Sequence, residues 1–199
     1  MPPISPQGQP PSIPHPLALQ LIERLRHDRC RGRILDFAAG SGRNSRALAA
    51  AGCDVVAIAD PQAYGESPFD GIDEHFVAAI STHGFLHGTQ ASIEKRLHAV
   101  AQRLEAPGLL YATFGSIRDS RFGTGTRIDD RTFAPANGDE RGVAHAYYDR
   151  ADLEGALGRS FVIESLEERG VDEIAGAWAH RERPLAGAVH WLAIARRNQ

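Results

Sequence analysis

The sequence predicts an α/β protein whose mainly parallel, twisted sheet carries helices on both faces. Two observations support this fold class. The stretch 33–60 reads as strand, glycine turn, helix and strand, which is a βαβ unit. Its two strands are almost continuously apolar, as strands are when helices cover both faces of a parallel sheet. A chain of 199 residues with this pattern is expected to form one domain over residues 1–199.

Composition and charge narrow the classes of function. Hydrophobic residues make up 42% of the chain and charged residues 24%, which favours a globular core over disorder. The net charge of -3 gives no electrostatic reason to expect nucleic acid or an anionic membrane as a partner. The sequence has no run of about 18 apolar residues, and its N-terminus lacks the apolar centre of a signal peptide. We therefore expect a cytoplasmic protein with Cys30 and Cys53 as reduced thiols.

The first expected elements lead up to the glycine turn. Residues 1–16 form a proline-rich N-terminal arm, and the apolar spacing after Pro16 predicts an amphipathic helix that begins at this proline. A strand at 33–37 follows. The helix after the glycines starts at Arg43 and is expected to stop at Gly52.

The rest of the chain alternates strands and helices around one long loop. The expected elements are strands at 53–60 and 76–82, a helix at 90–104, a strand at 108–116, a helix at 150–158, and strands at 160–168 and 188–197. Asp149 is the expected N-cap of the last helix. Segment 117–146 is rich in Arg, Asp and Gly and is interpreted as a long functional loop. The C-terminal strand is expected to be antiparallel.

Residues 34–45, ILDFAAGSGRNS, place a carboxylate four residues before a pair of glycines. Glycines let the backbone approach a ligand closely, and the following helix presents free N–H groups at its N-terminus. A dinucleotide usually needs a third glycine, where this chain has Ser45. S-adenosylmethionine instead carries an ammonium group, a sulfonium and two ribose hydroxyls. Asp36 is placed to organise the methionine end of such a ligand, and Asp60 to accept hydrogen bonds from its ribose.

Further motifs follow this stretch in a characteristic order. ILDFAAGSG, VVAIAD, STHGFLHG, APGLLYATFGS and a terminal strand pair succeed one another over roughly residues 17–197. This order resembles the class I S-adenosylmethionine-dependent methyltransferases. Arg43 and Asn44 follow the glycines as in the small-molecule branch that includes tellurite-resistance-type enzymes. The resemblance implies a Rossmann-like methyltransferase fold, S-adenosylmethionine as cofactor and a small molecule as methyl acceptor.

The resemblance also assigns cofactor-binding residues. The family pattern DxGxGxG falls on Asp36, Ala38, Gly40 and Gly42. At the first glycine position of the pattern, this chain has alanine. The full set of cofactor-binding candidates is Asp36, Ala38, Gly40, Gly42, Arg43, Asn44, Asp60 and Thr82.

One departure from the family concerns the segment after the ribose-binding strand. Residues 61–75 alone separate Asp60 from the next strand. Fifteen residues at about 3.3 Å each can span the return path but cannot also form a helix and a paired strand. We predict that the third strand and its preceding helix are missing. The ribose-binding strand would then be a sheet edge, which a homodimer could cover, and the adenine pocket would be open on one side.

His83 and Tyr148 are the candidate catalytic residues on the substrate side. His83 follows the fourth expected family strand, at the cofactor edge, although a structural histidine is an equally good interpretation. His83 and His87 could share a metal ion only within a helix, and no metal is predicted. His180 could cap the substrate cleft. Of His190 and Trp191, which alternate sides along a strand, one is expected in the core.

The expected loop offers a second set of substrate contacts. Its arginines are Arg118, Arg121, Arg127, Arg131 and Arg141. Together with His145, Tyr147 and Tyr148 they could bind an anionic or aromatic substrate. The simpler alternative is that they form surface ion pairs with Asp119, Asp129, Asp130 and Asp139.

Three functions are compatible with the sequence. Methyl transfer from S-adenosylmethionine to a small molecule is the leading hypothesis. A non-catalytic relative that has lost part of the adenine pocket is the first alternative. A nicotinamide-dependent oxidoreductase is the second, and the missing third glycine counts against it.

Overall fold

The computed structural model describes residues 13–58, 69, 72–138, 140–177 and 186–199. Most of the proline-rich arm, together with Asp60, Asp139, Trp178 and His180, lies outside the described residues.

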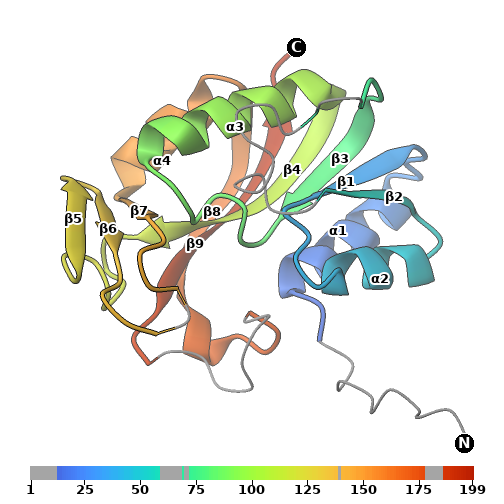
Figure 1. Cartoon of the computed structure of the whole chain (residues 1–199). Helices are drawn as coiled ribbons and strands as arrows, with labels where there is room; N and C mark the ends of the chain where they lie inside the picture. Colours follow the sequence, from blue (N-terminus) through green and yellow to red (C-terminus); the bar gives the residue numbers. More distant parts are fainter. Residues whose placement is uncertain (1–12, 59–68, 70–71, 139, 178–185) are drawn as a thin grey trace, which may run out of the picture.

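A twisted, mostly parallel sheet forms the centre of the molecule (Figure 1). Its main strands are β1 (Arg33–Phe37), β2 (Asp54–Ile58), β3 (Phe76–Ser81), β4 (Leu104–Ser116), β8 (Phe161–Gly170) and β9 (Val189–Arg197). β2, β1, β3 and β4 lie side by side and parallel, while β9 runs antiparallel to β4 and β8 antiparallel to β9. The antiparallel C-terminal strand is therefore confirmed.

Helices cover both faces of this sheet, as predicted (Figure 1). They are α1 (Pro16–His27), α2 (Arg43–Ala50), α3 (Gln90–Arg103) and α4 (Arg150–Gly158), with a 3-10 turn at Val171–Glu173. α1 and α2 lie on one face and α3 and α4 on the other. Asp149 caps α4 by accepting a hydrogen bond from the Asp152 amide (2.8 Å), which confirms its predicted role.

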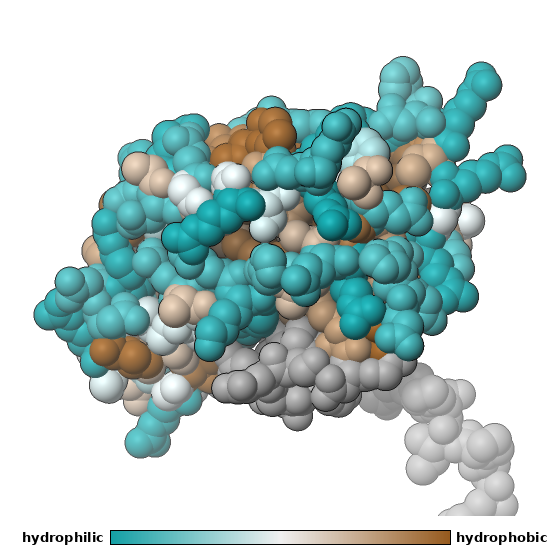
Figure 2. Space-filling view, turned by 90° about the horizontal axis from the view of Figure 1, so that it is seen from above, coloured by the Kyte–Doolittle hydropathy of each residue, from teal (hydrophilic) through white to brown (hydrophobic). Residues whose placement is uncertain are grey.

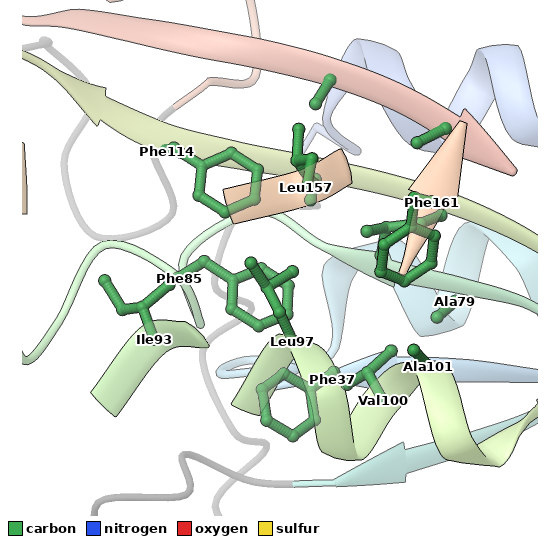
Figure 3. Packing of buried hydrophobic residues seen from close by; sticks show 14 of the residues in the cluster. Phe37, Ala79, Phe85, Ile93, Leu97, Val100, Ala101, Phe114, Leu157 and Phe161 are labelled. Atoms are coloured by element: carbon green, nitrogen blue, oxygen red, sulfur yellow. The ribbon is translucent and has the colours of Figure 1, made fainter. Parts of the chain in front are cut away.

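Each face has its own hydrophobic layer. Beneath α3 and α4, Phe85 stacks between Phe37 and Phe114 with ring centroids 5.4 Å away on each side (Figure 3). Fully burying a phenyl ring contributes about 2–3 kcal/mol. On the other face, α1 places Leu21 against a second layer that includes Ile34 of β1. The two layers hold the sheet rigid from both sides, which fixes the positions of its strand ends.

The predicted loop at 117–146 is wrong in part, because it contains regular strands. β5 (Thr126–Asp129) and β6 (Thr132–Ala134) form an antiparallel hairpin, and β7 (His145–Tyr148) pairs with β6 and with the end of β4. Strands of three or four residues are too short to show a period in the sequence. Pairing with neighbours, which a sequence does not display, defines them.

The segment between β2 and β3 agrees with the predicted shortening. Its described residues, 69 and 72–75, form neither helix nor strand, and within the described chain β2 pairs only with β1. Phe69 stacks on Phe37 with centroids 5.9 Å apart, which anchors this segment to the core. β2 is thus the last strand of the described sheet on this side.

The surface over α3 and α4 is mainly hydrophilic, with small separate hydrophobic patches (Figure 2). The exposed large hydrophobic side chains of the described residues are scattered: Ile13, Leu19, Ile128 and Val162. Among the helices described, none combines the length and the apolar character needed to cross a membrane.

Candidate functional site

The carboxyl ends of β1, β3 and β4 meet at one edge of the sheet, because these strands are parallel. Ligands of open α/β sheets bind beyond this edge. β1 leads there into the turn 38–42, in which the Gly42 amide donates to the Ala39 oxygen (2.9 Å). The Ala39 amide in turn donates to the oxygen of Ile58 (2.9 Å). The turn is thereby tied to the end of β2, and its glycines lie at the predicted cofactor edge.

The turn has a left-handed backbone at three positions. Their φ angles are 58° at Ala38, 54° at Gly40 and 73° at Gly42. Glycine adopts this conformation freely, whereas in alanine it costs about 1 kcal/mol. A Cβ added to Gly40 would meet nothing within 4 Å, so this part of the turn faces open space. A Cβ added to Gly84 would lie 2.7 Å from the Ala38 methyl group, so Gly84 gives that methyl group room.

Asp36 lies beneath the turn and is 1% exposed. Its Oδ2 accepts a hydrogen bond from the Ser45 hydroxyl (2.5 Å), which links β1 to the first turn of α2. Burial raises the pKa of this carboxyl, and the Ser45 hydrogen bonds and the Arg43 charge oppose the rise. A buried carboxylate therefore stands at the start of α2, where a cationic ligand group would be stabilised.

Arg43 and Asn44 are buried and bind protein groups. The Arg43 guanidinium donates to the main-chain oxygens of Ile13 (3.2 Å), Gly176 and Ala177 (3.2 Å). Burial lowers its pKa to about 10, and Asp36 offsets part of this shift. Through these bonds Arg43 joins α2 to the chain before α1 and to the chain after β8.

Asn44 connects two further segments. Its Oδ1 accepts from the His15 amide (3.0 Å), and its Nδ2 donates to the Thr82 hydroxyl (3.1 Å). The main-chain oxygen of Thr82 accepts from the Thr113 hydroxyl (2.6 Å). The ends of β3 and β4 are therefore linked by side chains to the helix that follows the glycine turn.

Two buried histidines, His15 and His190, and the half-buried His83 lie at the same edge and influence one another electrostatically. Burial lowers the pKa of His15 to about 3, with further lowering by Arg43 and His190. Burial also lowers the pKa of His190 to about 4, and it holds the pKa of His83 well below its usual value. All three imidazoles are thus neutral at pH 7. They form a polar wall without positive charge, which does not repel a sulfonium cation.

Tyr148 lies elsewhere. It is 1% exposed and belongs to the hydrophobic layer beneath α3 and α4, where its ring meets Phe114 edge-on with centroids 6.0 Å apart. Its hydroxyl is buried with no hydrogen-bond partner among the described residues, and burial raises its pKa. Its main-chain oxygen accepts from the Trp191 indole (3.0 Å). Tyr148 therefore acts as a core residue in this structure.

Comparison with known proteins gives a consistent picture of the fold. No family model matches the sequence, and no curated protein matches it. Among solved structures, 1,6-didemethyltoxoflavin-N1-methyltransferase of Burkholderia thailandensis, with bound 1,6-didemethyltoxoflavin and S-adenosylhomocysteine, gives a TM-score of 0.59 at 17% identity over 93% of this chain and 80% of its own. The CcbJ methyltransferase of Streptomyces caelestis gives a TM-score of 0.61 at 12% identity, over 97% of this chain and 94% of its own. TehB of Haemophilus influenzae gives a TM-score of 0.59 at 14% identity, over 90% of this chain and 62% of its own.

This chain has the class I methyltransferase fold. The predicted Rossmann-like architecture is confirmed by these similarities and by the strand order. The methyltransferase fold brings together most of the predicted site residues at one edge of the sheet. They are Asp36, Ala38, Gly40, Gly42, Arg43, Asn44, Thr82 and His83. Asp60 lies outside the described residues, and Tyr148 is the candidate that the structure places in the core.

Four arginines of segment 117–148 form ion pairs within the protein, as the simpler alternative expects. One of these pairs is not at the surface, because Asp119 is buried. Arg121 binds Asp119 through two hydrogen bonds (2.9 and 3.0 Å), and Arg127 pairs with Asp130. Arg131 pairs with Asp149 and Asp152, and Arg118 with Glu168. These partners satisfy the guanidinium groups within the protein.

Several residues of this edge had no assigned role in the sequence. They are His15, Ser45, Gly84 and Thr113. Ser45 is within the quoted glycine stretch, so its hydroxyl beside Asp36 was a usable signal. His15 is joined to the site only by the fold, through its amide bond to Asn44 and its Nδ1, which accepts from Leu17 (3.1 Å) at the start of α1.

A cavity of about 750 Å³ opens at the opposite, amino edge of the strands. Its lining includes Cys30, Cys53 and four arginines: Arg26, Arg29, Arg31 and Arg33. Both cysteines are free thiols. In this fold the amino edge faces away from the glycine turn, so we place the candidate site at the carboxyl edge despite the size of this cavity.

Proposed function

We propose that this protein transfers the methyl group of S-adenosylmethionine to a small-molecule acceptor. The observation that carries the proposal is the buried Asp36 beneath a glycine turn, at the carboxyl edge of a methyltransferase-fold sheet. The turn faces open space at Gly40, so a ligand can reach its backbone. α2 begins after Gly42, which has no side chain to cap the helix, and in its first turn the Ser45 amide and hydroxyl bind Asp36. These features fit the methionine end of the cofactor.

The bound cofactor would supply a methyl group on a positively charged sulfur. Asp36 and the turn 38–42 would hold its amino-acid end, with Thr82 beside them. Asp60 is proposed as the ribose partner. His83 would form the acceptor side of the site. The protein's main task is then to align the acceptor with the methyl group and to exclude water, because methyl transfer is an in-line displacement.

The low pKa of His83 limits the chemistry proposed for it. An imidazole that stays neutral far below pH 7 is a weak base. We therefore propose that His83 orients the acceptor by a hydrogen bond and that the acceptor is itself nucleophilic, as a neutral nitrogen is. His83→Ala should lower kcat with little change in cofactor affinity, whereas His83→Gln should restore part of the activity.

A second candidate function is a methyltransferase-fold protein without catalysis. It is favoured by the edge position of β2 within the described chain, since the family's adenine wall normally follows that strand. It is also favoured by Arg43 and Asn44, whose side chains bind protein groups. A nicotinamide-dependent oxidoreductase is less well supported, because Ser45 stands at the third glycine position and binds Asp36.

Calorimetric titration with S-adenosylmethionine and S-adenosylhomocysteine, with NAD as control, separates these candidates. We expect micromolar binding of both adenosyl ligands and none of NAD. Asp36→Asn should weaken that binding at least tenfold, whereas Asp54→Asn, at the exposed amino end of β2, should leave it unchanged. Binding followed by methylation of a trial acceptor supports the enzyme. Binding without turnover across nitrogen, oxygen and sulfur acceptors favours the non-catalytic relative. Absence of binding contradicts the enzyme and also favours that relative, which has lost part of the adenine pocket.

We further propose that the protein works in the cytoplasm and forms a homodimer through the edge of β2. The support is the free thiols of Cys30 and Cys53 and the position of β2 at the end of the described sheet. Light scattering should give twice the chain mass, 21.6 kDa. A charged substitution at an exposed position of this strand, Ala57→Lys, should favour the monomer.

A further inference from the structure

His87, Glu140 and His145 form a compact cluster that the methyl-transfer site does not use. His87 lies in the turn after β3, Glu140 in the connection between β6 and β7, and His145 at the start of β7. The Nε2 atom of His145 is 3.2 Å from Oε2 of Glu140, and that of His87 is 3.6 Å from Oε1. One ligand atom from each of the three side chains lies within 4.8 Å of the others. Both imidazoles therefore face the same carboxylate.

The hydrogen bonding of His145 determines which of its nitrogens carries the proton. Its Nδ1 is 2.8 Å from the main-chain oxygen of Val143, which can only accept. Nδ1 is therefore the N–H, and in the neutral ring Nε2 presents its lone pair to the carboxylate of Glu140. Two facing lone pairs repel one another, and His145 is only 4% exposed. The contact at 3.2 Å needs a second proton or a cation between the two atoms.

The spacing of the ligand atoms fits a metal ion. Zinc binds imidazole nitrogen and carboxylate oxygen at about 2.0–2.2 Å, so two ligand atoms of a tetrahedral site lie about 3.3 Å apart. The two nitrogen–oxygen distances in the cluster are 3.2 and 3.6 Å. The hydrogen bond from Nδ1 of His145 to a main-chain oxygen is also the outer contact that orients metal-binding histidines.

The backbone around both histidines is fixed independently of any ion. The Gly88 amide donates to the Ala144 oxygen (2.7 Å), and the Ala146 amide donates to the Leu86 oxygen (3.1 Å). These bonds place the neighbours of His87 and His145 in an antiparallel bridge. The two rings meet edge-on with centroids 4.9 Å apart. A preformed backbone reduces the entropy lost when a ligand is bound.

Two basic side chains lie near the cluster, and both also bind other groups of the protein. Arg121 lies 3.6 Å from Glu140, and its charge is balanced by two hydrogen bonds to the buried carboxylate of Asp119. Arg96 donates to the main-chain oxygen of His87. The Glu140 carboxylate thus lies beside a guanidinium that Asp119 also binds, and its two oxygens face the two imidazoles.

We propose that His87, Glu140 and His145 bind one divalent transition-metal ion of the Zn²⁺ type, with open coordination positions for water or a ligand. Two imidazole nitrogens and one carboxylate suit Zn²⁺ and its neighbours better than Mg²⁺ or Ca²⁺, which prefer oxygen ligands. The site is distinct from the glycine turn, and it stands whether or not the protein is a methyltransferase. Sequence spacing hid it, because His87 is far in the chain from Glu140 and His145.

Direct metal binding tests this site. The probes are Zn²⁺ by calorimetry and Co²⁺ by visible absorption, at pH 7.5, on the full chain without a histidine tag. A Cys30→Ser, Cys53→Ser background removes the thiols that would compete for the same ions. We expect one equivalent of Zn²⁺, reversible by a chelator. Co²⁺ should give ligand-field bands without thiolate charge transfer.

Variants assign the ligands. His87→Ala, His145→Ala and Glu140→Gln should each weaken Zn²⁺ affinity at least tenfold. His98→Ala and Glu154→Gln, which alter exposed side chains on α3 and α4, should leave it unchanged. Equal losses in the control variants, or no Zn²⁺ or Co²⁺ binding by the folded background protein, would overturn the proposal. Should a ligand variant fail to fold, the Co²⁺ spectrum and stoichiometry of the background protein decide.

Discussion

The two ends of the parallel strands differ in how they treat polar groups. At the carboxyl ends, Asp36 and its neighbours are buried and joined by short side-chain bonds. At the amino ends, Arg33 pairs with Asp54 and Glu74 on the exposed surface, beside the cavity of about 750 Å³. Burying polar groups opposes folding unless they are paired, and Asp36 and Asn44 at the carboxyl edge are paired. The lining of the cavity at the amino edge includes four exposed arginines instead.

Acid should affect the carboxyl edge most. The folded-state pKa values of His15 (about 3) and His190 (about 4) lie below the ordinary 6.5, so the folded protein binds fewer protons than the unfolded chain. Stability is then complete above about pH 6.5 and falls as the pH drops towards 4. By pH 5 the loss is about 2 kcal/mol for each of these two histidines. His83, whose pKa is also lowered, adds to this loss.

Urea unfolding at pH 7.5 and pH 5 measures this loss. His190→Gln should remove about 2 kcal/mol of it, and the exposed His98→Gln none. An equal acid response in all three proteins would contradict the expectation. The charged and titratable groups that act on His15 and His190 are Arg43, Asp119, Arg121, Glu140 and His145.

Two arginines offer a direct contrast between the edges. Arg43→Met leaves the main-chain oxygens of Gly176 and Ala177 without their donor, which should lower the free energy of unfolding by about 3 kcal/mol. Arg33→Met removes only exposed ion pairs and should cost less than about 1 kcal/mol. Chemical denaturation of both variants checks this, and similar losses would remove the distinction between the two edges.

Substitution of Gly84 tests the close packing at the turn, and Gly155 in α4 serves as the comparison. A Cβ at Gly84 would lie 2.6 Å from Ser81 Oγ and 2.7 Å from the Ala38 Cβ, so Gly84→Ala should destabilise by about 2 kcal/mol. Gly155, inside α4, has nothing within 4 Å of the corresponding position. Gly155→Ala should stabilise by about 0.5–1 kcal/mol. Thermal unfolding gives both signs, and a neutral Gly84→Ala would show that the turn can move.

The smallest expected effect is a gain at Ala38. Replacing it with glycine restores the family's residue at a left-handed position and should stabilise by about 0.5–1 kcal/mol. The same variant should bind S-adenosylmethionine at least as tightly as the natural chain. Weaker binding would mean that the alanine methyl group itself contacts the ligand. Paired unfolding and calorimetric measurements distinguish these results.

The sequence predicted the order of the main elements and the position of the glycine turn. Buried strands such as 33–37 and 76–81 show as apolar runs, and α1 shows its buried face by spacing, because these patterns are local. The same logic failed for the hairpin of β5 and β6, whose partners rather than their composition define them. Tyr148 was predicted to be catalytic because of its phenol group, but sheet packing places its ring in the hydrophobic core.

By itself, the sequence determined the βαβ unit, the Asp36–glycine motif and the shortened segment after β2, since each depends on neighbours in the chain. The tertiary structure alone decided which distant side chains meet. It placed His15 beside Asn44, Gly84 against the methyl group of Ala38, and His87 near Glu140 and His145. The physical reason is that contacts between remote segments depend on strand pairing and helix packing, and burial then determines which groups keep their charge.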